Sequence, residues 1–216
     1  MKRTEPAQRY GVHKIFGPTI QGEGGMTGTV CHFLRLSGCN MWDGRPETRA
    51  DSHCPFCDTD FFSHTMMTAN EIVEELTSLE QLRYVEWVTI SGGEPALQID
   101  QNLIDTISDY YHVAVETNGT RQLRAEVDYL TVSPKLPMSQ TVVRRCDSLK
   151  LLWPHPNPLI YPSAYNDIEA EERYLQPIET GDPAKDAINI ESAIHCLYTM
   201  PGWKLSLQTH KMIGVE

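Results

Sequence analysis

The sequence has no run of about 18 apolar residues, the length that a membrane-spanning helix requires. Residues 1–6 contain no apolar core of a secretory signal, so a cytoplasmic protein is the default expectation. Internal repeats, low-complexity segments and linker-like stretches are also missing. We therefore expect residues 1–216 to form a single domain rather than a repeat array or a string of domains.

Positive charge is scarce in this chain. Lys and Arg number 18 against 29 Asp and Glu, which gives a formal net charge of −11 at pH 7. Such a balance argues against nucleic acid or an anionic membrane surface as the main partner. The contents of hydrophobic residues, 40%, and of charged residues, 22%, are typical of a soluble globular domain.

Cysteine is also sparse, and three of the six cysteines lie close together as Cys39-x14-Cys54-x2-Cys57. In a cytosolic protein such cysteines more often bind metal than form disulfides. Thiolates select zinc, copper(I) or an iron–sulfur cluster. A saturated cluster normally takes four cysteines, so three would leave one iron without a protein ligand. That open position is typical of a catalytic metal site rather than a structural one.

The cysteine spacing alone leaves two other interpretations open. One is a Cys3His zinc site, with His53 or His32 as the fourth ligand. The other is that the three residues are ordinary buried thiols. The remaining cysteines match no motif, and we expect them to be core thiols: Cys31, Cys146 and Cys196.

Hydrophobic periodicity and turn residues predict a chain in which strands alternate with helices or long crossovers. The first 29 residues are expected to be rich in loops. Strands are predicted at residues 29–36, 85–90, 113–116, 129–132, 148–153 and 173–176, with a seventh at 204–208. Helices are predicted at residues 68–79, 100–110 and 184–198, with Thr68 or Asn70 and then Asp100 as N-caps.

This order implies parallel βα units, and polar motifs follow the carboxyl ends of the strands. The motifs are Ser37-Gly38-Cys39, Ser91-Gly92-Gly93-Glu94, Glu116-Thr117-Asn118-Gly119 and Ser133-Pro134-Lys135. Sites in barrel-type α/β folds gather at that edge. The crossovers 117–128, 134–147 and 154–165 are too short or too rich in proline for full helices. The predicted fold is therefore an α/β partial, open βα barrel of about six parallel strands with an incomplete outer helical layer.

Arg35 lies within an apolar strand, where an unpaired charge would be costly. Its partner is either a neighbouring Asp or Glu or the carboxylate of a substrate. Gln21-Gly22-Glu23-Gly24-Gly25 is a glycine-rich turn whose backbone can approach a ligand closely.

The cysteine motif after one strand and Gly92-Gly93-Glu94-Pro95 after another resemble the radical S-adenosylmethionine (SAM) superfamily. Within it the chain is similar to the 7-carboxy-7-deazaguanine synthase family, whose fold is of the predicted open-barrel type. The matching segments span residues 20 to 216: 20–24, 33–40, 57–61, 92–95, 116–119, 133–135, 176–177 and 206–211. The x14 spacing is itself the pattern of one branch of that family.

The resemblance implies a 4Fe–4S cluster on Cys39, Cys54 and Cys57, SAM as cofactor, and a Mg²⁺ ion on Thr59. It implies SAM contacts by Phe56, Gly93, Glu94, Glu116, Asn118, Ser133, Pro134, Lys135, Gln176, Pro177, Ile178 and Glu179. It implies substrate contacts by Ile20, Gln21, Gly22, Glu23, Arg35, Ser91, His210 and Glu216. The implied reaction converts 6-carboxy-5,6,7,8-tetrahydropterin into 7-carboxy-7-deazaguanine with loss of ammonia. The implied partners are a flavodoxin-like or ferredoxin-like electron donor and a second copy of the chain in a homodimer.

Two other functions remain as alternatives at this point. Another radical SAM enzyme, such as a glycyl-radical activase, needs the cluster and SAM residues but not Arg35 or Thr59. A zinc-binding interaction module gives no reason for the Gly-Gly-Glu-Pro motif.

The segment at residues 206–216 carries a separate expectation. Its apolar residues Met212, Ile213 and Val215 should pack back onto the fold. The terminal carboxylate of Glu216 is then expected to accept hydrogen bonds from the pterin.

Overall fold

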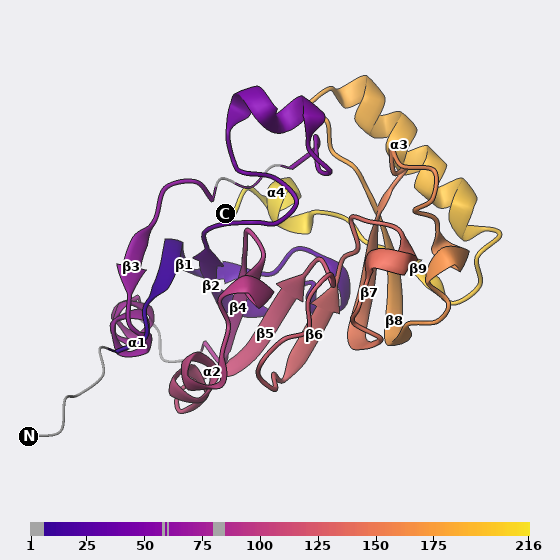
Figure 1. Cartoon of the computed structure of the whole chain (residues 1–216). Helices are drawn as coiled ribbons and strands as arrows, with labels where there is room; N and C mark the ends of the chain where they lie inside the picture. Colours follow the sequence, from indigo (N-terminus) through magenta and orange to yellow (C-terminus); the bar gives the residue numbers. More distant parts are fainter. Residues whose placement is uncertain (1–6, 58, 60, 80–84) are drawn as a thin grey trace, which may run out of the picture.

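The computed structural model describes residues 7–57, 59, 61–79 and 85–216. Nine strands in this part of the chain form one sheet in the order β3-β1-β2-β4-β5-β6-β7-β8-β9 (Figure 1). Their bounds are β1 (Tyr10–Ile20), β2 (Val30–Leu36), β3 (Thr65–Met67), β4 (Trp87–Gly92), β5 (His112–Thr117), β6 (Tyr129–Val132), β7 (Arg145–Trp153), β8 (Glu169–Pro177) and β9 (Trp203–Leu205).

From β2 to β9 every neighbouring pair of strands in the sheet is parallel. These are the six predicted strands and the seventh, and the mixed α/β architecture with its open parallel sheet confirms the predicted fold class. Because the strands are parallel, their carboxyl ends, and the motifs that follow them, lie at one edge.

The prediction that the first 29 residues are rich in loops is wrong. Residues Tyr10–Ile20 form β1, which pairs antiparallel with β2 and with β3. Gly17-Pro18 interrupts the apolar pattern, but the β1–β2 register shifts between Phe16 and Thr19, so the proline lies at an irregularity. Proline is tolerated in a strand at such positions.

The helices are α1 (Ala69–Ser78), α2 (Gln101–Ser108), α3 (Pro183–Leu197) and the short α4 (Thr209–Ile213). Thr68 caps α1 in a reciprocal capping box with Glu71, and Asp100 caps α2, as predicted. Short 3₁₀ turns at Met138–Gln140 and Pro162–Tyr165 occupy two of the crossovers that were predicted to lack full helices. The outer helical layer is accordingly incomplete.

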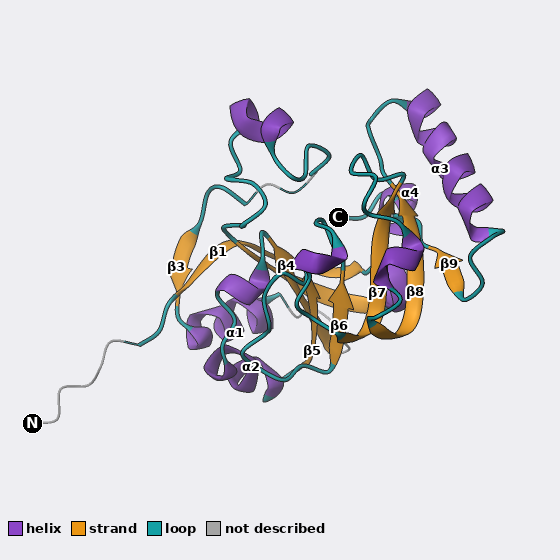
Figure 2. Cartoon of the chain, turned by 45° about the vertical axis from the view of Figure 1, so that its right-hand side comes forward, coloured by secondary structure: helices purple, strands orange, loops and turns teal. Residues whose placement is uncertain are grey.

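Two hydrophobic clusters flank the sheet at different places along it. The first joins β1, β2, β4 and β5 to α1 and α2, which lie together on one side of the sheet (Figure 2). Among its fully buried side chains are Leu34, Ile72, Ile90 and Leu103. The second cluster joins β6, β7 and β8, and the partly buried Cys196 and Leu197 of α3 pack against it. Each half of the sheet is thus packed against its own hydrophobic cluster, and the carboxyl edge of the strands is left open.

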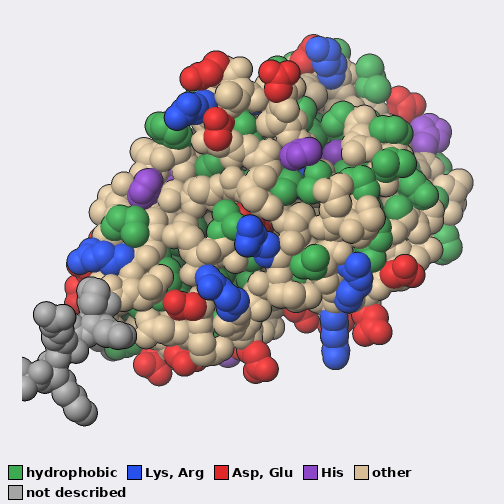
Figure 3. Space-filling model, viewed as in Figure 1, with side chains coloured by type: hydrophobic (Ala, Val, Ile, Leu, Met, Phe, Trp, Pro, Cys, Tyr) green, Lys and Arg blue, Asp and Glu red, His purple; other side chains and the backbone are tan. Residues whose placement is uncertain are grey.

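Cys31 and Cys146 are buried, as expected of core thiols, whereas Cys196 is only partly buried. On the face drawn in Figure 3, acidic and basic side chains are scattered rather than gathered into one patch. No helix among the described residues is long and apolar enough to cross a membrane.

Candidate active site

A pocket of about 250 Å³ opens at the carboxyl edge of the parallel strands. Every residue predicted to bind the cluster, Mg²⁺, SAM or substrate lines it except Pro134. The lining also includes residues to which the sequence assigned no ligand contact: Phe16, Phe33, Met41, Trp42, Phe61, Gly92, Thr117, Lys150, Leu152 and Gln208. Most of these are apolar or aromatic and were indistinguishable from core residues in the sequence.

The three cysteines of the motif share one wall of this pocket. Cys54 is buried with Met41 and Leu136, and Cys39 and Cys57 pack against the same small cluster. Burial raises the pKa of the Cys54 thiol to about 12 and raises that of Cys39. Both thiols therefore keep their protons until a metal centre supplies positive charge.

His53 and His32, the possible fourth ligands of a zinc site, do not form such a site with the three cysteines. His32 lies within β2 and packs edge-on against Tyr111, with ring centroids 5.8 Å apart. His53 is exposed. In the described ranges no three His, Cys, Asp or Glu side chains converge on a position for a single metal ion.

The Gly92-Gly93 turn fits against the residue before Cys39. The Gly93 N–H donates to Leu36 O at 2.9 Å, and the Glu94 N–H donates to Gly38 O at 2.8 Å. A Cβ atom on Gly93 would lie 1.9 Å from that same Gly38 oxygen, so only glycine fits without a shift of the backbone. The turn therefore fixes the backbone from which the Cys39 side chain extends.

Glu94 joins the ends of β4 and β5. Its side chain is 1% exposed and accepts hydrogen bonds from Thr117 Oγ1 at 2.5 Å, Asn118 N at 2.7 Å and Ala96 N at 2.9 Å. These bonds satisfy the buried carboxylate from within the protein. Glu94 thus holds the Gly-Gly-Glu-Pro turn against the Thr-Asn-Gly turn, in addition to the SAM contact predicted for it.

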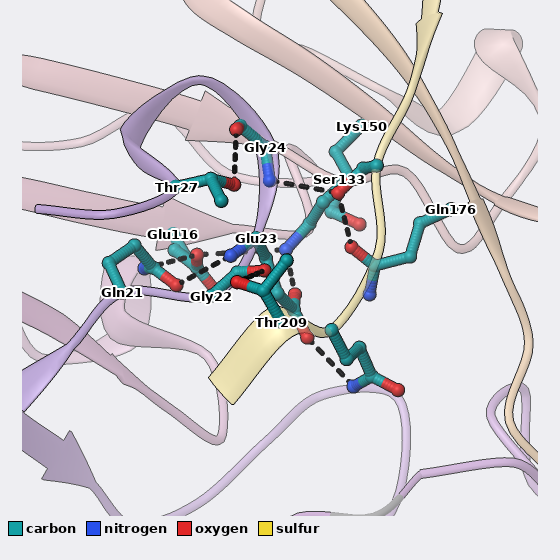
Figure 4. A network of polar contacts seen from close by, with 12 residues as sticks. Gln21, Gly22, Glu23, Gly24, Thr27, Glu116, Ser133, Lys150, Gln176 and Thr209 are labelled. Carbon is teal, nitrogen blue, oxygen red and sulfur yellow. Dashed lines mark hydrogen bonds and ion pairs between the residues drawn. The ribbon is translucent and has the colours of Figure 1, made fainter. Parts of the chain in front are cut away.

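A buried group of charges lies beside the glycine-rich turn (Figure 4). Lys150 of β7 donates a hydrogen bond to Glu23, and its Nζ lies 3.6 Å from Glu116 Oε1. Burial alone would raise the pKa of Glu23, but Lys150 and three donated hydrogen bonds lower it to about 2. Lys150 was missed because its strand is apolar, although a cation inside an apolar strand was the same signal that singled out Arg35.

Arg35 lies on the pocket wall beside aromatic side chains. Its guanidinium carbon is 5.0 Å from the centre of the Phe16 ring, which in turn stacks on Phe33 at 5.2 Å. Within the described ranges Arg35 makes no ion pair with Asp or Glu, so the neighbouring-acid interpretation finds no partner there. Thr59, the predicted Mg²⁺ ligand, lines the same pocket.

Lys135 lines the pocket together with the other residues expected to contact SAM except Pro134. Its ammonium group donates to Ser133 O at 2.8 Å and to Ser133 Oγ at 2.5 Å, and burial lowers its pKa. Asn118 donates to Asn40 Oδ1 at 2.9 Å, which ties the β5 turn to the cysteine loop. Gln176 to Glu179 continue this side of the pocket from the end of β8.

The segment after β9 returns to the site through polar contacts. Thr209 N donates to Gly22 O at 3.0 Å, Thr19 Oγ1 donates to Glu216 O at 2.5 Å, and Lys14 pairs with the Glu216 side chain. His210 packs against Gly22, where a Cβ would meet its ring nitrogen at 2.0 Å.

The expectation that the apolar side chains of this segment pack onto the fold is wrong. Met212 is 74%, Ile213 61% and Val215 37% exposed. Hydrogen bonds and an ion pair, rather than hydrophobic burial, hold the segment in place.

Comparisons with known proteins agree with this geometry, although no family model matches the sequence. The chain is 38% identical over 218 residues to 7-carboxy-7-deazaguanine synthase of Nitratidesulfovibrio vulgaris strain Hildenborough, covering 95% of this chain and 99% of the relative. It is 38% identical over 216 residues to the synthase of Caulobacter vibrioides, with the same coverage. The chain belongs to the 7-carboxy-7-deazaguanine synthase family.

Among solved structures, QueE from Escherichia coli has a TM-score of 0.62 with 22% identity, covering 93% of this chain and 94% of that one. At that identity the likeness supports the fold. Members of the 7-carboxy-7-deazaguanine synthase family are radical SAM lyases, so the protein is a radical SAM enzyme that uses a 4Fe–4S cluster and SAM.

The residues present fit these groups. Three thiols share one wall, and the Met41 N–H already points at Cys39 Sγ at 3.4 Å, a hydrogen bond of the kind that tunes cluster sulfurs. Next to them the bare backbone of Gly93 lines the pocket and allows a ligand to approach closely.

Proposed function

We propose that the protein converts 6-carboxy-5,6,7,8-tetrahydropterin into 7-carboxy-7-deazaguanine with release of ammonia, a step of deazapurine biosynthesis of the queuosine type. The observation that carries this proposal is that one pocket brings together the three cysteines, the Gly92-Gly93 turn and Arg35 in a chain of this family. A glycyl-radical activase would have no use for a lone arginine at that place.

The cluster and SAM supply the radical chemistry when they are bound, and the protein supplies binding, orientation and electrostatics. Cys39, Cys54 and Cys57 would hold the cluster, while Gly93, Ser133, Lys135 and the segment after Gln176 would hold SAM. Arg35 would bind the substrate carboxylate, because a guanidinium group matches a carboxylate with two parallel hydrogen bonds. The aromatic wall around Arg35 would exclude water from that pair.

The turn at Gln21 and Gly22 is proposed to position the pterin ring from the opposite side of the pocket. Ile20, Glu23, Ser91, His210 and Glu216 line the same region and complete the proposed substrate set. Gly22 is held by Thr209 and His210 at close range, so its backbone has little freedom to move away from a bound ring. A pre-positioned wall of this kind reduces the cost of ordering the site on binding.

We further propose a Mg²⁺ ion at Thr59, a flavodoxin-like or ferredoxin-like electron donor, a homodimer and a cytoplasmic location. Magnesium keeps most of its water shell and needs only one or two protein oxygens together with substrate oxygens. A single hydroxyl in the same pocket as Arg35 is sufficient for that role.

The test is anaerobic turnover of the reconstituted protein with SAM, reductant and the carboxylated pterin. We expect 7-carboxy-7-deazaguanine and ammonia in equal amounts, detected by chromatography and mass spectrometry. Cys54→Ala should abolish product and SAM cleavage, whereas the matched variant Cys146→Ala, in the second hydrophobic cluster and outside the pocket lining, should keep both. Chelator should slow the wild type, and Thr59→Ala should blunt the recovery that added magnesium gives.

Two results would contradict the proposal. A wild-type protein that contains zinc instead of iron and sulfide would exclude the radical mechanism. If chelator leaves turnover unchanged, the proposals of a magnesium ion and of Thr59 as its ligand are wrong.

A further inference from the structure

We propose that Lys150 is a positioning residue for the substrate, which holds Glu116 in place as a hydrogen-bond acceptor for the N–H groups of the pterin ring. The inference rests on the proposed function, and it assigns a role to a residue that no motif of the sequence singled out. It begins from the contacts that Lys150 makes with two carboxylates from different segments.

Lys150 is nearly enclosed, with its side chain only 4% exposed, yet it lines the pocket. Its ammonium group donates to Glu23 Oε2 and lies 3.6 Å from Glu116 Oε1. Gln208 Nε2 donates to the other Glu23 oxygen at 2.8 Å. Both oxygens of Glu23 are therefore engaged within the protein.

Glu116 is engaged on one oxygen only. Its Oε1 accepts from Gln21 Nε2 at 3.2 Å and faces Lys150, whereas its Oε2 accepts no hydrogen bond from the residues that the structure describes. The side chain is 26% exposed and lines the pocket. An ionised carboxylate is an acceptor only, so the second oxygen is suited to an N–H donor of a ligand. The aminopyrimidinone edge of a pterin carries such donors.

Lys150 can hold Glu116 as an acceptor only if its ammonium group stays charged and fixed in place. Two carboxylates this close would repel each other, and one would take up a proton unless a cation lay between them. Coulombic attraction to Glu116 and Glu23 outweighs the burial of Lys150 and raises its pKa, so the ammonium form persists.

The same contacts join four segments of the chain around the substrate side of the pocket (Figure 4). Gln21 and Glu23 come from the glycine-rich turn, Glu116 from β5, Lys150 from β7 and Gln208 from the segment after β9. The side-chain oxygen Oε1 of Gln21 also accepts a hydrogen bond from Glu23 N at 3.1 Å. Lys150 is the one cation among these five side chains, so its removal takes away the ion pair that holds Glu116 in position.

The experiment compares Lys150→Met with wild type by anaerobic calorimetric titration of 6-carboxytetrahydropterin into cluster-loaded, SAM-bound protein. We expect the pterin Kd to rise by about tenfold or more, because a partner of a buried charge network is lost. Glu116, which the resemblance placed among the SAM contacts, is here assigned to the pterin instead. The Kd of SAM and the iron content should then stay within about twofold of wild type, because the cysteines, Gly93 and Ser133 make no contact with Lys150 among the contacts of the described residues. In turnover the loss should fall on KM more than on kcat.

Three further variants keep the result interpretable. Lys204→Met removes a lysine whose ion pair with Glu172 lies outside the pocket lining, and it should leave pterin binding unchanged. Lys150→Met/Glu23→Gln carries one buried negative charge fewer, so it can be measured if Lys150→Met does not fold. Because Glu23 belongs to the proposed substrate set, this double variant is compared with Glu23→Gln alone, and it should bind pterin more weakly than Glu23→Gln. Lys150→Met/Glu116→Gln should bind pterin no more weakly than either single variant, because both changes remove the same acceptor.

A Lys150→Met protein that binds pterin within about twofold of wild type would overturn the inference. So would equal losses of pterin, SAM and cluster, since these would show a general structural role. A wild-type protein that loads cluster and binds SAM but not pterin would overturn the proposed function itself, and the inference with it.

Discussion

Arg35 and Lys150 each place a positive charge on a strand whose neighbours are apolar. Lys150 is satisfied by Glu23 and Glu116, whereas Arg35 rests on the Phe16 ring without a carboxylate partner among the described residues. A partly buried guanidinium without an anionic partner is well suited to bind an incoming carboxylate through two parallel hydrogen bonds. The pocket is thus polarised, with a cation available at one wall and a carboxylate oxygen available at another.

At the same scale, Gly93→Ala should lower stability and cluster content together. The new Cβ would clash with the Gly38 backbone next to Cys39, and backbone cannot move aside as a flexible side chain can. We expect a loss of about 1–3 kcal/mol, as for overpacking, with reduced iron binding after reconstitution. Thermal melting and iron assay of the same preparations measure both effects.

The control for this substitution is Gly28→Ala, where a Cβ would meet nothing within 4 Å although φ is +92°. It should cost about 1 kcal/mol from backbone strain alone and leave iron content unchanged. Equal iron content in the two variants would show that the Gly93 contact does not position Cys39.

At the scale of elements, α2 is tied to β1 through its N-cap. Asp100 Oδ1 accepts from Leu103 N at 3.0 Å and from Tyr10 OH at 2.7 Å. Tyr10 is fully buried, and burial raises its pKa to about 12. The cap therefore satisfies a buried hydroxyl group as well as a free amide of the helix.

Asp100→Ala should consequently destabilise the protein more than a cap normally does. Loss of an N-cap costs about 0.5–2 kcal/mol, and the Tyr10 hydroxyl group would lose an acceptor in addition, at about 1–3 kcal/mol for a buried group. Asp182→Ala removes the exposed cap of α3, whose Oδ1 accepts from Ala184 N at 3.0 Å. Its ion pair with Lys185 is exposed and contributes little, so the loss should be close to that of a cap alone. Denaturant unfolding of both variants measures the difference, and equal losses would show that the Tyr10 contact adds nothing.

The elements that could be predicted from the sequence are those with an uninterrupted pattern. The strands β2 and β4 to β9, the caps Thr68 and Asp100 and the missing crossover helices follow from local periodicity and composition. β1 could not be predicted, because Gly17-Pro18 breaks its pattern and its pairing depends on β2 and β3. The short helix α4 was missed for a similar reason, since its position depends on the contact of Thr209 with Gly22.

For the whole molecule, acid has two opposite effects on stability, one through the net negative charge and one through the buried Glu23–Lys150 ion pair. Lowering the pH reduces the net charge of −11 and so relieves general repulsion. It also protonates Glu23, which breaks the Glu23–Lys150 ion pair. At physiological ionic strength exposed charges are screened within about 8 Å, but a buried pair is screened much less. The buried pair should therefore dominate the acid limb of stability.

The sign follows from the pKa of Glu23. Its ordinary value is 4.5 and its folded value is about 2, so the unfolded chain binds the extra proton between those values. Stability should therefore fall as the pH drops from 4.5 towards 2. Thermal melts from pH 6 to pH 2 should show this slope in wild type and a flatter one in Glu23→Gln.

The control is Glu172→Gln, which removes a partly exposed carboxylate paired with Lys204. It should change the slope less than Glu23→Gln does, because solvent screens that pair. Parallel slopes for wild type and Glu23→Gln would show that Glu23 titrates normally in the folded protein.

The site as a whole was predictable only where its residues belong to motifs. The cysteines, the glycine turns and Arg35 stand out in the sequence by type and spacing. Lys150 and Gln208 do not, because their importance comes from Glu23 and Glu116, which lie far away along the chain. Glu94 was predicted as a ligand contact, and its hydrogen bonds to Thr117 and Asn118 became visible only when β4 and β5 were seen side by side.

The pairing of residues 14–22 with residues 209–216 has a consequence for the order in which the molecule is made. Lys14 and Thr19 contact Glu216 across separations of 202 and 197 residues. While the chain emerges from the ribosome, the first hydrophobic cluster can assemble as soon as β5 is complete. The glycine-rich turn must wait for Lys150, Gln208 and Thr209, so a nascent chain that is already folded over most of its length still has an unfinished substrate wall.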